Sequence, residues 1–222
     1  MPQYDRSISS KPWHEQPCTM SVMRTLVVIE FLTVDGVMQG LGSADEDTEG
    51  GFAHGGWGAP FAEAIHEAVT ATEVSKTTAY LFGRRTYEKM SAFWPHQPDT
   101  NEMARQLNHT PKYVATRTLT HLTWSGATVL EGDLETAVTD LKAAGDGDIA
   151  LLGSGRLAHE LMLLDLVDEF RLFVHPLLLG TGKRLFNELP APRQLHLTSS
   201  DATSLGSLVL GYTLVPPQQT GC

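Results

Sequence analysis

The chain has 222 residues, 41% of them hydrophobic and 19% charged, as is typical of a globular protein of one large domain. Its formal net charge of −10 argues against general nucleic-acid binding, which depends on neutralising phosphates. No apolar run reaches the roughly 18 residues of a membrane span, and no secretory signal is visible. We therefore expect a cytoplasmic protein without nucleic-acid or membrane partners. The two cysteines, Cys18 and Cys222, form no disulfide framework or zinc motif, and no metal is expected.

The two ends of the chain differ from its middle in composition and in hydrophobic periodicity. Residues 1–22 are polar, contain three prolines and show little periodicity, so we expect a flexible tail there. The sequence of a folded domain occupies residues 23–216, and residues 217–222 are expected to form a second short tail.

The first predicted element is a buried strand over residues 26–32, which are apolar and β-branched apart from Glu30. Asp35 and Gly36 then indicate a turn. A long glycine-rich loop over residues 40–58 carries several acids, and loops of that length in compact domains are usually functional. Pro60 is well placed to open a helix with Phe61, Ile65, Ala68 and Val69 on its apolar face.

Strand-then-helix units follow along the rest of the chain. Strands are predicted over residues 79–82, 112–116, 128–130, 148–152 and 170–174. Helices are predicted over residues 85–90, after Asp133 as N-cap, and over residues 157–164. Alternating residues from Leu195 and from Leu208 indicate an antiparallel hairpin at the end. The pattern predicts an α/β fold with a mostly parallel sheet, helices on both faces and a C-terminal antiparallel hairpin.

Three strand ends carry residues suited to phosphate. A helix N-terminus offers unpaired N–H groups and partial positive charge, and glycine lets an anion approach the backbone. Taken singly, each junction could be an ordinary turn, but three in one sheet predict a dinucleotide site, because ligands bind at the carboxyl ends of parallel strands. The three junctions are Gly83-Arg84-Arg85-Thr86, Thr116-Arg117-Thr118 and Gly153-Ser154-Gly155.

The same junctions favour NADPH over NADH. The 2′-phosphate of NADP is bound by arginine, whereas the ribose of NAD is bound by an acid at the end of the second strand. The junctions contain Arg84, Arg85 and Arg117 and no acid. We therefore expect NADPH as the cofactor.

The candidates for proton transfer are Glu30, Asp35, Glu63 and His66. Glu30 stands out because an acid within an apolar strand needs a partner or a raised pKa, although it could instead face outward on an edge. His175 precedes a proline on a strand and is more typical of a packed histidine than of a catalyst. The aromatic residues that could wall a flat ring, or equally belong to the core, are Trp57, Phe61, Phe93 and Trp94.

Taken together, the motifs resemble one family. They are Thr33-Val34-Asp35-Gly36-Val37, Gly55-Gly56-Trp57, Leu81-Phe82-Gly83-Arg84-Arg85-Thr86-Tyr87, Lys112-Tyr113-Val114-Ala115-Thr116-Arg117-Thr118, Leu152-Gly153-Ser154-Gly155-Arg156-Leu157, Leu166-Val167-Asp168-Glu169, and the run from His175-Pro176 to Leu185-Phe186. Their order and spacing resemble the dihydrofolate reductase-like family, in the branch similar to the C-terminal reductase domain of the riboflavin-biosynthesis deaminase–reductase. The resemblance covers residues 24–215.

The resemblance implies a sheet of about eight strands and an oxidoreductase that transfers hydride from NADPH to a C=N or C=O bond. It implies that the pyrophosphate is held by Gly83, Arg84, Arg85 and Thr86 together with Gly153, Ser154, Gly155, Arg156 and Leu157. It also implies that Thr116, Arg117 and Thr118 lie near the 2′-phosphate. By the same resemblance, Phe31, Trp57 and Phe61 lie near the nicotinamide and the substrate.

The chain also departs from this pattern. Dihydrofolate reductases carry an acid in the first helix, and that position falls on Ala62 here, so folate reduction is not expected. A riboflavin-type enzyme needs a site for ribose phosphate, which Lys183 and Arg184 could provide, but the zinc-binding deaminase half is absent.

Three hypotheses therefore stand. The first is an NADPH-dependent reductase of a small heterocyclic or carbonyl substrate, with Glu30 and Asp35 as its catalytic candidates. The second is a riboflavin-type 5-amino-6-(5-phosphoribosylamino)uracil reductase. The third is a nucleotide-binding protein without activity. A homodimer is expected from the resemblance.

Overall fold

The computed structural model describes residues 23–65 and 76–215. The expected tails lie outside these residues, as does the second half of the helix predicted after Pro60, with His66, Ala68 and Val69. Pro60 itself lies in the first turn of a 3-10 helix, Ala59–Phe61, and residues 62–65 continue as α-helix.

The described residues form one eight-stranded sheet with the order β4-β3-β2-β5-β1-β6-β8-β7. The strands are β1 (Thr25–Thr33), β2 (Thr77–Gly83), β3 (Lys112–Ala115), β4 (Ala127–Val129), β5 (Asp148–Leu152), β6 (Glu169–His175), β7 (Leu195–Ala202) and β8 (Leu208–Leu214). The neighbouring strands from β4 to β6 in this order pair in parallel: β4 with β3, β3 with β2, β2 with β5, β5 with β1, and β1 with β6. Strand β8 pairs antiparallel with both β6 and β7. The predicted mostly parallel sheet with a C-terminal hairpin is thus confirmed.

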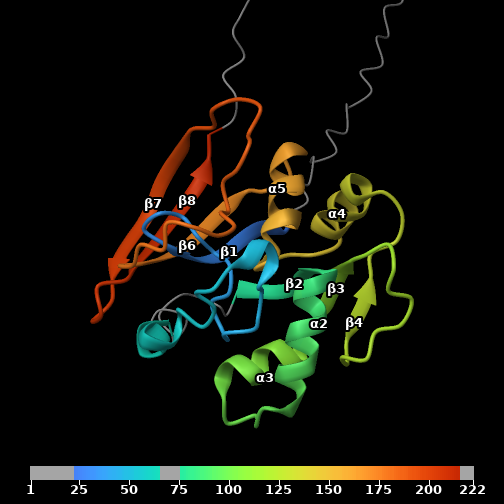
Figure 1. Ribbon diagram of the computed structural model, residues 1–222. Helices are drawn as coiled ribbons and strands as arrows, with labels where there is room; N and C mark the ends of the chain where they lie inside the picture. Colours follow the sequence, from blue (N-terminus) through green and yellow to red (C-terminus); the bar gives the residue numbers. More distant parts are fainter. Residues whose placement is uncertain (1–22, 66–75, 216–222) are drawn as a thin grey trace, which may run out of the picture.

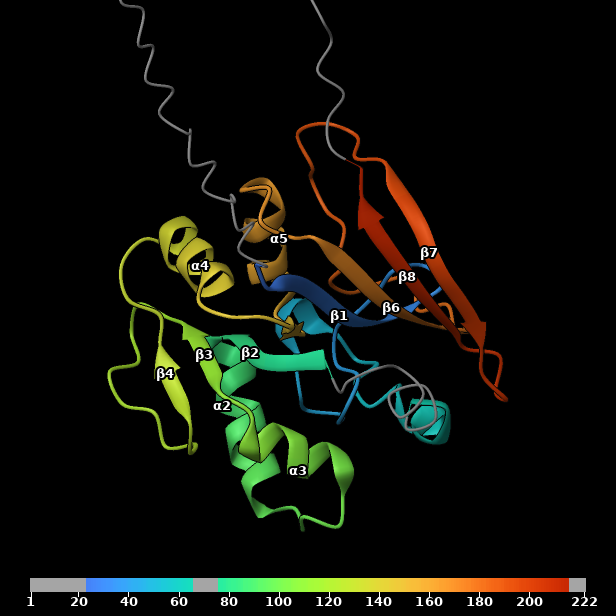
Figure 2. The same ribbon diagram turned by 180° about the vertical axis from the view of Figure 1, so that it is seen from behind.

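Helices cover both faces of the sheet, as predicted. In Figures 1 and 2, α4 (Leu134–Ala143) and α5 (Gly155–Leu163) lie on one face, and α2 (Arg84–Phe93) and α3 (Glu102–His109) lie on the other. Asp133 caps α4 as predicted, since its side chain accepts a hydrogen bond from the backbone N–H of Thr136. Asn101 caps α3 by accepting a hydrogen bond from the N–H of Ala104, and this helix was not predicted from the sequence.

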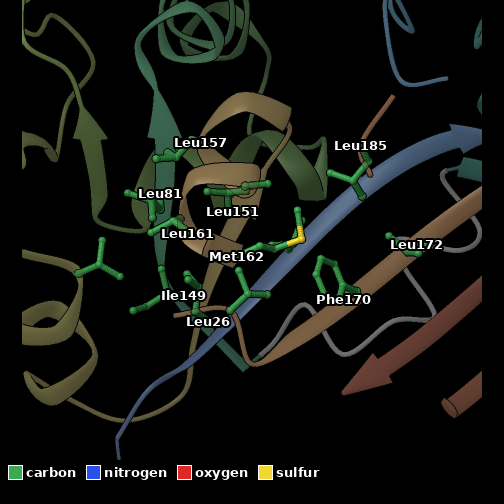
Figure 3. Close-up of a cluster of buried hydrophobic side chains, with 14 of the residues drawn as sticks. Leu26, Leu81, Ile149, Leu151, Leu157, Leu161, Met162, Phe170, Leu172 and Leu185 are labelled. Carbon is green, nitrogen blue, oxygen red and sulfur yellow. The ribbon is translucent and has the colours of Figure 1, made fainter. Parts of the chain in front are cut away.

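The sheet separates two hydrophobic clusters because successive side chains of a strand point to opposite faces. Alternating β1 residues Leu26, Val28 and Leu32 belong to the cluster beneath α4 and α5. Figure 3 shows Leu157, Leu161 and Met162 of α5 packed over this part of the sheet. Val27 and Ile29 belong instead to the cluster beneath α2 and α3.

Candidate active site

The sheet contains a gap where β5 ends beside β1. The two strands pair only as far as Ile29 and Leu152, whereas β1 continues beside β6 to Thr33. Because the N–H of Gly153 bonds the carbonyl of Ile29, the backbone groups of Phe31, two residues further on, also point toward the side where β5 has ended. The chain leaves β5 for α5 on one face. This is the kind of crevice in which open α/β sheets bind ligands.

Two of the three predicted phosphate junctions meet at the carboxyl ends of the neighbouring strands β2 and β5. The hydroxyl of Ser154 accepts a hydrogen bond from the N–H of Gly83 at 2.9 Å and donates one to the hydroxyl of Thr86 at 2.6 Å. A side chain at position 83 would crowd this contact, because its Cβ would lie 3.0 Å from the Ser154 oxygen. These two hydrogen bonds of Ser154 hold the N-termini of α2 and α5 side by side.

Neither of these helix N-termini carries a side-chain cap. The N-cap positions are Gly83 for α2 and Ser154 for α5, and neither side chain bonds the first turn of its own helix. Among the described residues, the first N–H groups of both helices thus lack a capping side-chain acceptor, and two positive dipole ends lie together. Such an arrangement suits an anion with more than one phosphate.

The rest of the α5 junction contributes mainly backbone. The α5 helix begins at Gly155, where a Cβ would lie 2.4 Å from the sulfur of Met38, so the residue's lack of a side chain permits this contact. Arg156 is exposed and lies 3.4 Å from Glu160, one turn along the helix. Leu157 is buried in the core beneath α5, which leaves only its backbone for a ligand.

The predicted arginines differ in their partners. Arg84 pairs with Glu88 of its own helix at 3.1 Å, and Arg85 pairs with Glu49 of the glycine-rich loop at 2.7 Å. Arg117 is exposed and has no ion pair among residues 23–65 and 76–215. Beside it, the hydroxyl of Thr116 accepts from the N–H groups of Thr118 and Leu119, which fixes the turn that presents Arg117.

Acidic side chains of the glycine-rich loop contact Lys183 on the other side of the site. The Lys183 ammonium lies 2.7 Å from both Asp47 and Glu49, and Glu49 also holds Arg85. Hydrogen bonds from Lys183 and Arg85 lower the pKa of Glu49. Two cations predicted to bind phosphate are thus neutralised by one loop.

Gln39 organises this loop, and sequence analysis did not single it out. Its buried side chain donates to the carbonyls of Asp47 and Glu49, both at 3.0 Å, and accepts from the N–H of Lys183 at 3.0 Å. Its backbone carbonyl accepts from the indole N–H of Trp57 at 2.8 Å. A single glutamine just before a glycine-rich loop gives no periodic signal that could have revealed this role.

Glu30 is buried beside the gap. One carboxylate oxygen accepts a 3.4 Å bond from the N–H of Phe31, and the other has no partner among the described residues. Burial raises the pKa of Glu30 to about 8. A carboxyl group with such a pKa is largely protonated at neutral pH and can give up a proton.

Asp35 is held very differently. It accepts hydrogen bonds from the Thr33 hydroxyl at 2.6 Å, the N–H of Leu179 at 3.2 Å and the N–H of Gly180 at 2.7 Å, and Arg184 lies 3.7 Å away. These bonds, led by that of Thr33, lower the pKa of Asp35 to about 2. The carboxylate therefore stays ionised and joins the turn after β1 to the loop after β6. This favours an anchoring role, and the predicted catalytic role of Asp35 stays a prediction.

Aromatic side chains gather on the α2 face of β1 and β6. The Phe31 ring stacks on Phe173 with centroids 4.6 Å apart, and Trp57 and Phe61 flank His175 at 5.7 and 4.9 Å. We call Phe31, Trp57, Phe61 and Phe173 the aromatic seat. The predicted substrate residues Phe31, Trp57 and Phe61 are thus brought together, whereas Phe93 and Trp94 contact each other at the end of α2.

Glu30 and the aromatic seat lie on opposite faces of β1. Glu30 alternates with Val28 and Leu32 of the α5-side cluster, whereas Phe31 follows Val27 and Ile29 of the other cluster. Glu63, another of the proton-transfer candidates, is exposed. His175 shares a face of the sheet with the aromatic seat, although its sequence context was more typical of a packed histidine.

The sequence profile of the RibD C-terminal domain matches residues 24–209. The chain belongs to the RibD C-terminal domain family. This is a family of reductases, which supports an oxidoreductase and confirms the resemblance found in the motifs. The Bacillus subtilis protein YyaP is 33% identical over 135 residues, which are 60% of this chain and 71% of YyaP.

Solved structures share the fold at low sequence identity. A riboflavin biosynthesis protein from Shewanella sp. PV-4 has a TM-score of 0.61 at 18% identity, covering 86% of this chain and 99% of its own. A pyrimidine reductase-like protein from Corynebacterium diphtheriae has a TM-score of 0.57 at 12% identity, covering 87% and 92%. The Thermotoga maritima diaminohydroxyphosphoribosylaminopyrimidine deaminase/5-amino-6-(5-phosphoribosylamino)uracil reductase has a TM-score of 0.56 at 11% identity, with 87% of this chain matching 57% of that one.

The part of the chain that the structure describes contains neither a cluster of metal-binding side chains nor a membrane-spanning helix. Within residues 23–65 and 76–215, no three histidine, cysteine or acidic residues gather as a metal site would require. In the same residues no helix has the length and apolar character needed to cross a membrane.

Proposed function

We propose that this protein is an NADPH-dependent reductase that delivers hydride to a small heterocyclic or carbonyl substrate. The main support is the pair of uncapped helix N-termini, fastened by the contact of Ser154 with Gly83 and Thr86 beside the gap between β5 and β1. Membership in a reductase family agrees with this chemistry.

The residues present fit a phosphorylated dinucleotide. The first N–H groups of α2 and α5 would hold the pyrophosphate, and Ser154 keeps the two helix ends together. Arg117, which has no ion pair among the described residues, would hold the 2′-phosphate. NADPH supplies the hydride, while the protein binds, orients and excludes water.

In this proposal Glu30 supplies a proton at the gap. Its carboxyl group is buried, its raised pKa keeps the proton bound at neutral pH, and one oxygen lacks a partner among the described residues. Because Glu30 faces away from the aromatic seat, the proton would reach the substrate through a water at the end of β5.

A thermal-shift titration with NADPH, NADH and buffer tests the cofactor. A ligand at a hundred times its dissociation constant stabilises the fold by roughly 2.7 kcal/mol. We expect a larger shift with NADPH than with NADH, followed by NADPH oxidation with members of a heterocycle and carbonyl panel. An absence of stabilisation by either nucleotide would contradict the proposal and favour a fold that has lost its cofactor site.

A second candidate is the uracil-reductase step named for the Thermotoga maritima relative. Family membership favours it, but Lys183, one of the two residues that could bind the ribose phosphate, is already paired with Asp47 and Glu49. This favours an uncharged substrate over a phosphorylated one. Complementation of a riboflavin auxotroph that lacks the reductase tests this candidate, and growth would establish it.

We also propose that the protein forms a cytoplasmic homodimer. The edge strand β7 is exposed from His196 onward, and Leu197, Leu205 and Leu208 of the hairpin are exposed by 47, 44 and 43%. Edge strands with apolar side chains readily pair with a second copy. Sedimentation velocity at micromolar concentration should show a dimer, and a monomer alone would refute this proposal.

A further inference from the structure

We propose that the Nε2 atom of His175 is the hydrogen-bonding contact for a planar, uncharged heteroaromatic substrate whose ring packs in the aromatic seat. This inference rests on the reductase function proposed above and names the substrate class of that site. The His175 ring lies at the carboxyl end of β6, among the rings of Phe31, Trp57 and Phe61.

A hydrogen bond with Ser207 orients the His175 ring. Its Nδ1 atom lies 2.8 Å from the hydroxyl of Ser207, and the imidazole is 1% exposed. Ser207 is itself held by the hairpin turn, where its N–H donates to the Thr203 hydroxyl at 3.1 Å and its carbonyl accepts from the N–H of Thr203 at 2.8 Å. The turn between β7 and β8 therefore sets the orientation of the imidazole.

The opposite ring nitrogen has no hydrogen-bond partner in the part of the chain that the structure describes. Nε2 is buried and makes no hydrogen bond to any described residue. A buried polar group left unpaired is costly, and native proteins normally pair such groups or use them in function. Lys112 shows the normal case in this chain, since its buried ammonium donates to the carbonyls of Asn108, Thr110 and Ser125 at 3.0, 2.8 and 3.0 Å.

Position separates His175 from the other unpaired groups. Within the described residues the buried side-chain atoms without partners belong to Glu30, Tyr80, His159 and His175. Tyr80 lies in the middle of β2 and His159 within α5. His175 ends β6, on the face of the sheet that carries the aromatic seat.

The surroundings select a flat and uncharged ring. Phe31 is nearly parallel to the imidazole, with an interplanar angle of 12° and centroids 6.2 Å apart, and Trp57 meets it edge-on. Burial lowers the pKa of His175 to about 4, so the imidazole is neutral at physiological pH and offers a hydrogen bond without charge. Aromatic walls gain most from a planar partner, and a single polar contact then orients it.

Phe61 provides the way in. Its ring covers His175 at 4.9 Å, yet it is partly exposed and lies in the short 3-10 turn Ala59–Phe61 rather than in the sheet. In this proposal the Phe61 side chain rotates to admit the substrate ring to Nε2.

The test compares two probes of the same two-ring shape, quinazolin-4-one and naphthalene, of which only the first has a polar edge. Dissociation constants are measured for the wild type, His175→Phe and His175→Gln, with and without saturating NADP⁺. We expect His175→Phe to weaken quinazolin-4-one binding roughly tenfold and naphthalene binding less than twofold. His175→Gln should restore part of the loss.

A spectroscopic readout distinguishes contact from packing. In ¹⁵N-labelled wild-type protein, quinazolin-4-one should shift the His175 Nε2 resonance more than naphthalene does. Equal loss of both probes in His175→Phe, or no binding of either probe by wild-type protein that binds NADPH, overturns the proposal. So does a loss of NADPH affinity with unchanged quinazolin-4-one binding, because His175 would then contact the cofactor.

These measurements distinguish a failure of the reductase function from a failure of the role of His175. If NADPH does not bind the wild type, the proposed function fails, while the probe measurements without cofactor still decide the role of His175. If NADPH binds and is oxidised but the variants treat both probes alike, the reductase stands and His175 is a core residue. Ser207→Ala serves as a second variant, which should weaken quinazolin-4-one binding selectively by freeing the imidazole.

Discussion

Glu49 and Arg85 form a 2.7 Å ion pair that joins the glycine-rich loop to the N-terminus of α2. The same carboxylate holds Lys183 at 2.7 Å, so the loop is attached to both the β2 and the β6 side of the site. An anionic ligand at Arg85 must compete with this carboxylate. The affinity for such a ligand therefore depends on how firmly the loop holds its two cations.

Replacing Glu49 with glutamine should raise the affinity for NADPH. The variant frees Arg85 from a carboxylate that stays ionised at neutral pH, because its pKa is lowered. Exposed ion pairs contribute little, so we expect the dissociation constant for NADPH to decrease about twofold to fivefold, and by less at high salt. Isothermal titration measures this change, and the matched control is Glu102→Gln, which breaks the exposed pair of Glu102 with Arg105, a residue with no predicted cofactor role. An unchanged dissociation constant in Glu49→Gln would show that Arg85 does not meet the cofactor.

Arg117 should distinguish NADPH from NADH. Arg117→Ala removes an exposed cation that has no ion pair among the described residues and lies beside the turn fixed by Thr116. A charge-assisted contact to phosphate contributes about 1.5–3 kcal/mol, so NADPH should bind at least tenfold more weakly while NADH is unaffected. Parallel titrations with the two nucleotides check this, and equal losses for both would place the 2′-phosphate elsewhere.

Glu30→Gln should change how stability depends on pH. The pKa of Glu30 is raised from 4.5 to about 8, so the folded state binds a proton that the unfolded state releases. The stabilisation is complete below about pH 4.5 and is lost as the pH rises through about 8. Chemical denaturation from pH 5 to 9 should show a decline, on the order of 4 kcal/mol, that the variant lacks. Parallel curves would mean that Glu30 is not protonated in the folded protein.

Glu30→Gln should also lower the reductase rate at neutral pH, because glutamine cannot release a proton. Turnover by the wild type should fall as the pH rises through about 8, whereas the residual rate of the variant should lack this decline. NADPH affinity serves as the control and should be unchanged. A variant with wild-type turnover would exclude Glu30 as the proton donor.

Asp35→Asn should destabilise the fold more than it harms chemistry. The carboxylate accepts from Leu179 and Gly180 and its pKa is lowered to about 2. Its stabilisation is present above about pH 4 and lost as the pH falls through about 2. We expect a loss of roughly 1–2 kcal/mol at pH 7 by denaturant titration, with turnover within a few-fold of the wild type. A stable but inactive variant would instead assign Asp35 a catalytic role.

The sequence determined much of the fold. Apolar periodicity gave β1, β2, β5, β6 and α4 with small errors at their ends, because burial on one or both faces leaves a local pattern. The strand predicted at residues 128–130 lies one residue earlier, as Ala127–Val129. The helix α3 was missed because its eight residues bury only Ala104 and Leu107.

The glycine junctions could also be recognised locally, because a strand end, a glycine and a helix start are adjacent in the chain. That Ser154 joins Gly83 and Thr86, 71 and 68 residues away, follows only from the pairing of β2 with β5. The contacts of Lys183 with Asp47 and Glu49 likewise span more than 130 residues. Such contacts leave no periodic trace in the sequence.

His175 shows most clearly why the sequence alone could not predict all contacts of the site. Its sequence context predicted a packed histidine, and only the tertiary structure shows that Ser207 holds one ring nitrogen while the other is buried with no partner among the described residues. Local sequence determines which face of a strand a side chain occupies, because alternation is a property of the backbone. What that side chain meets there is decided by elements distant in the chain, whose packing brings the β7–β8 turn and the aromatic seat to one histidine.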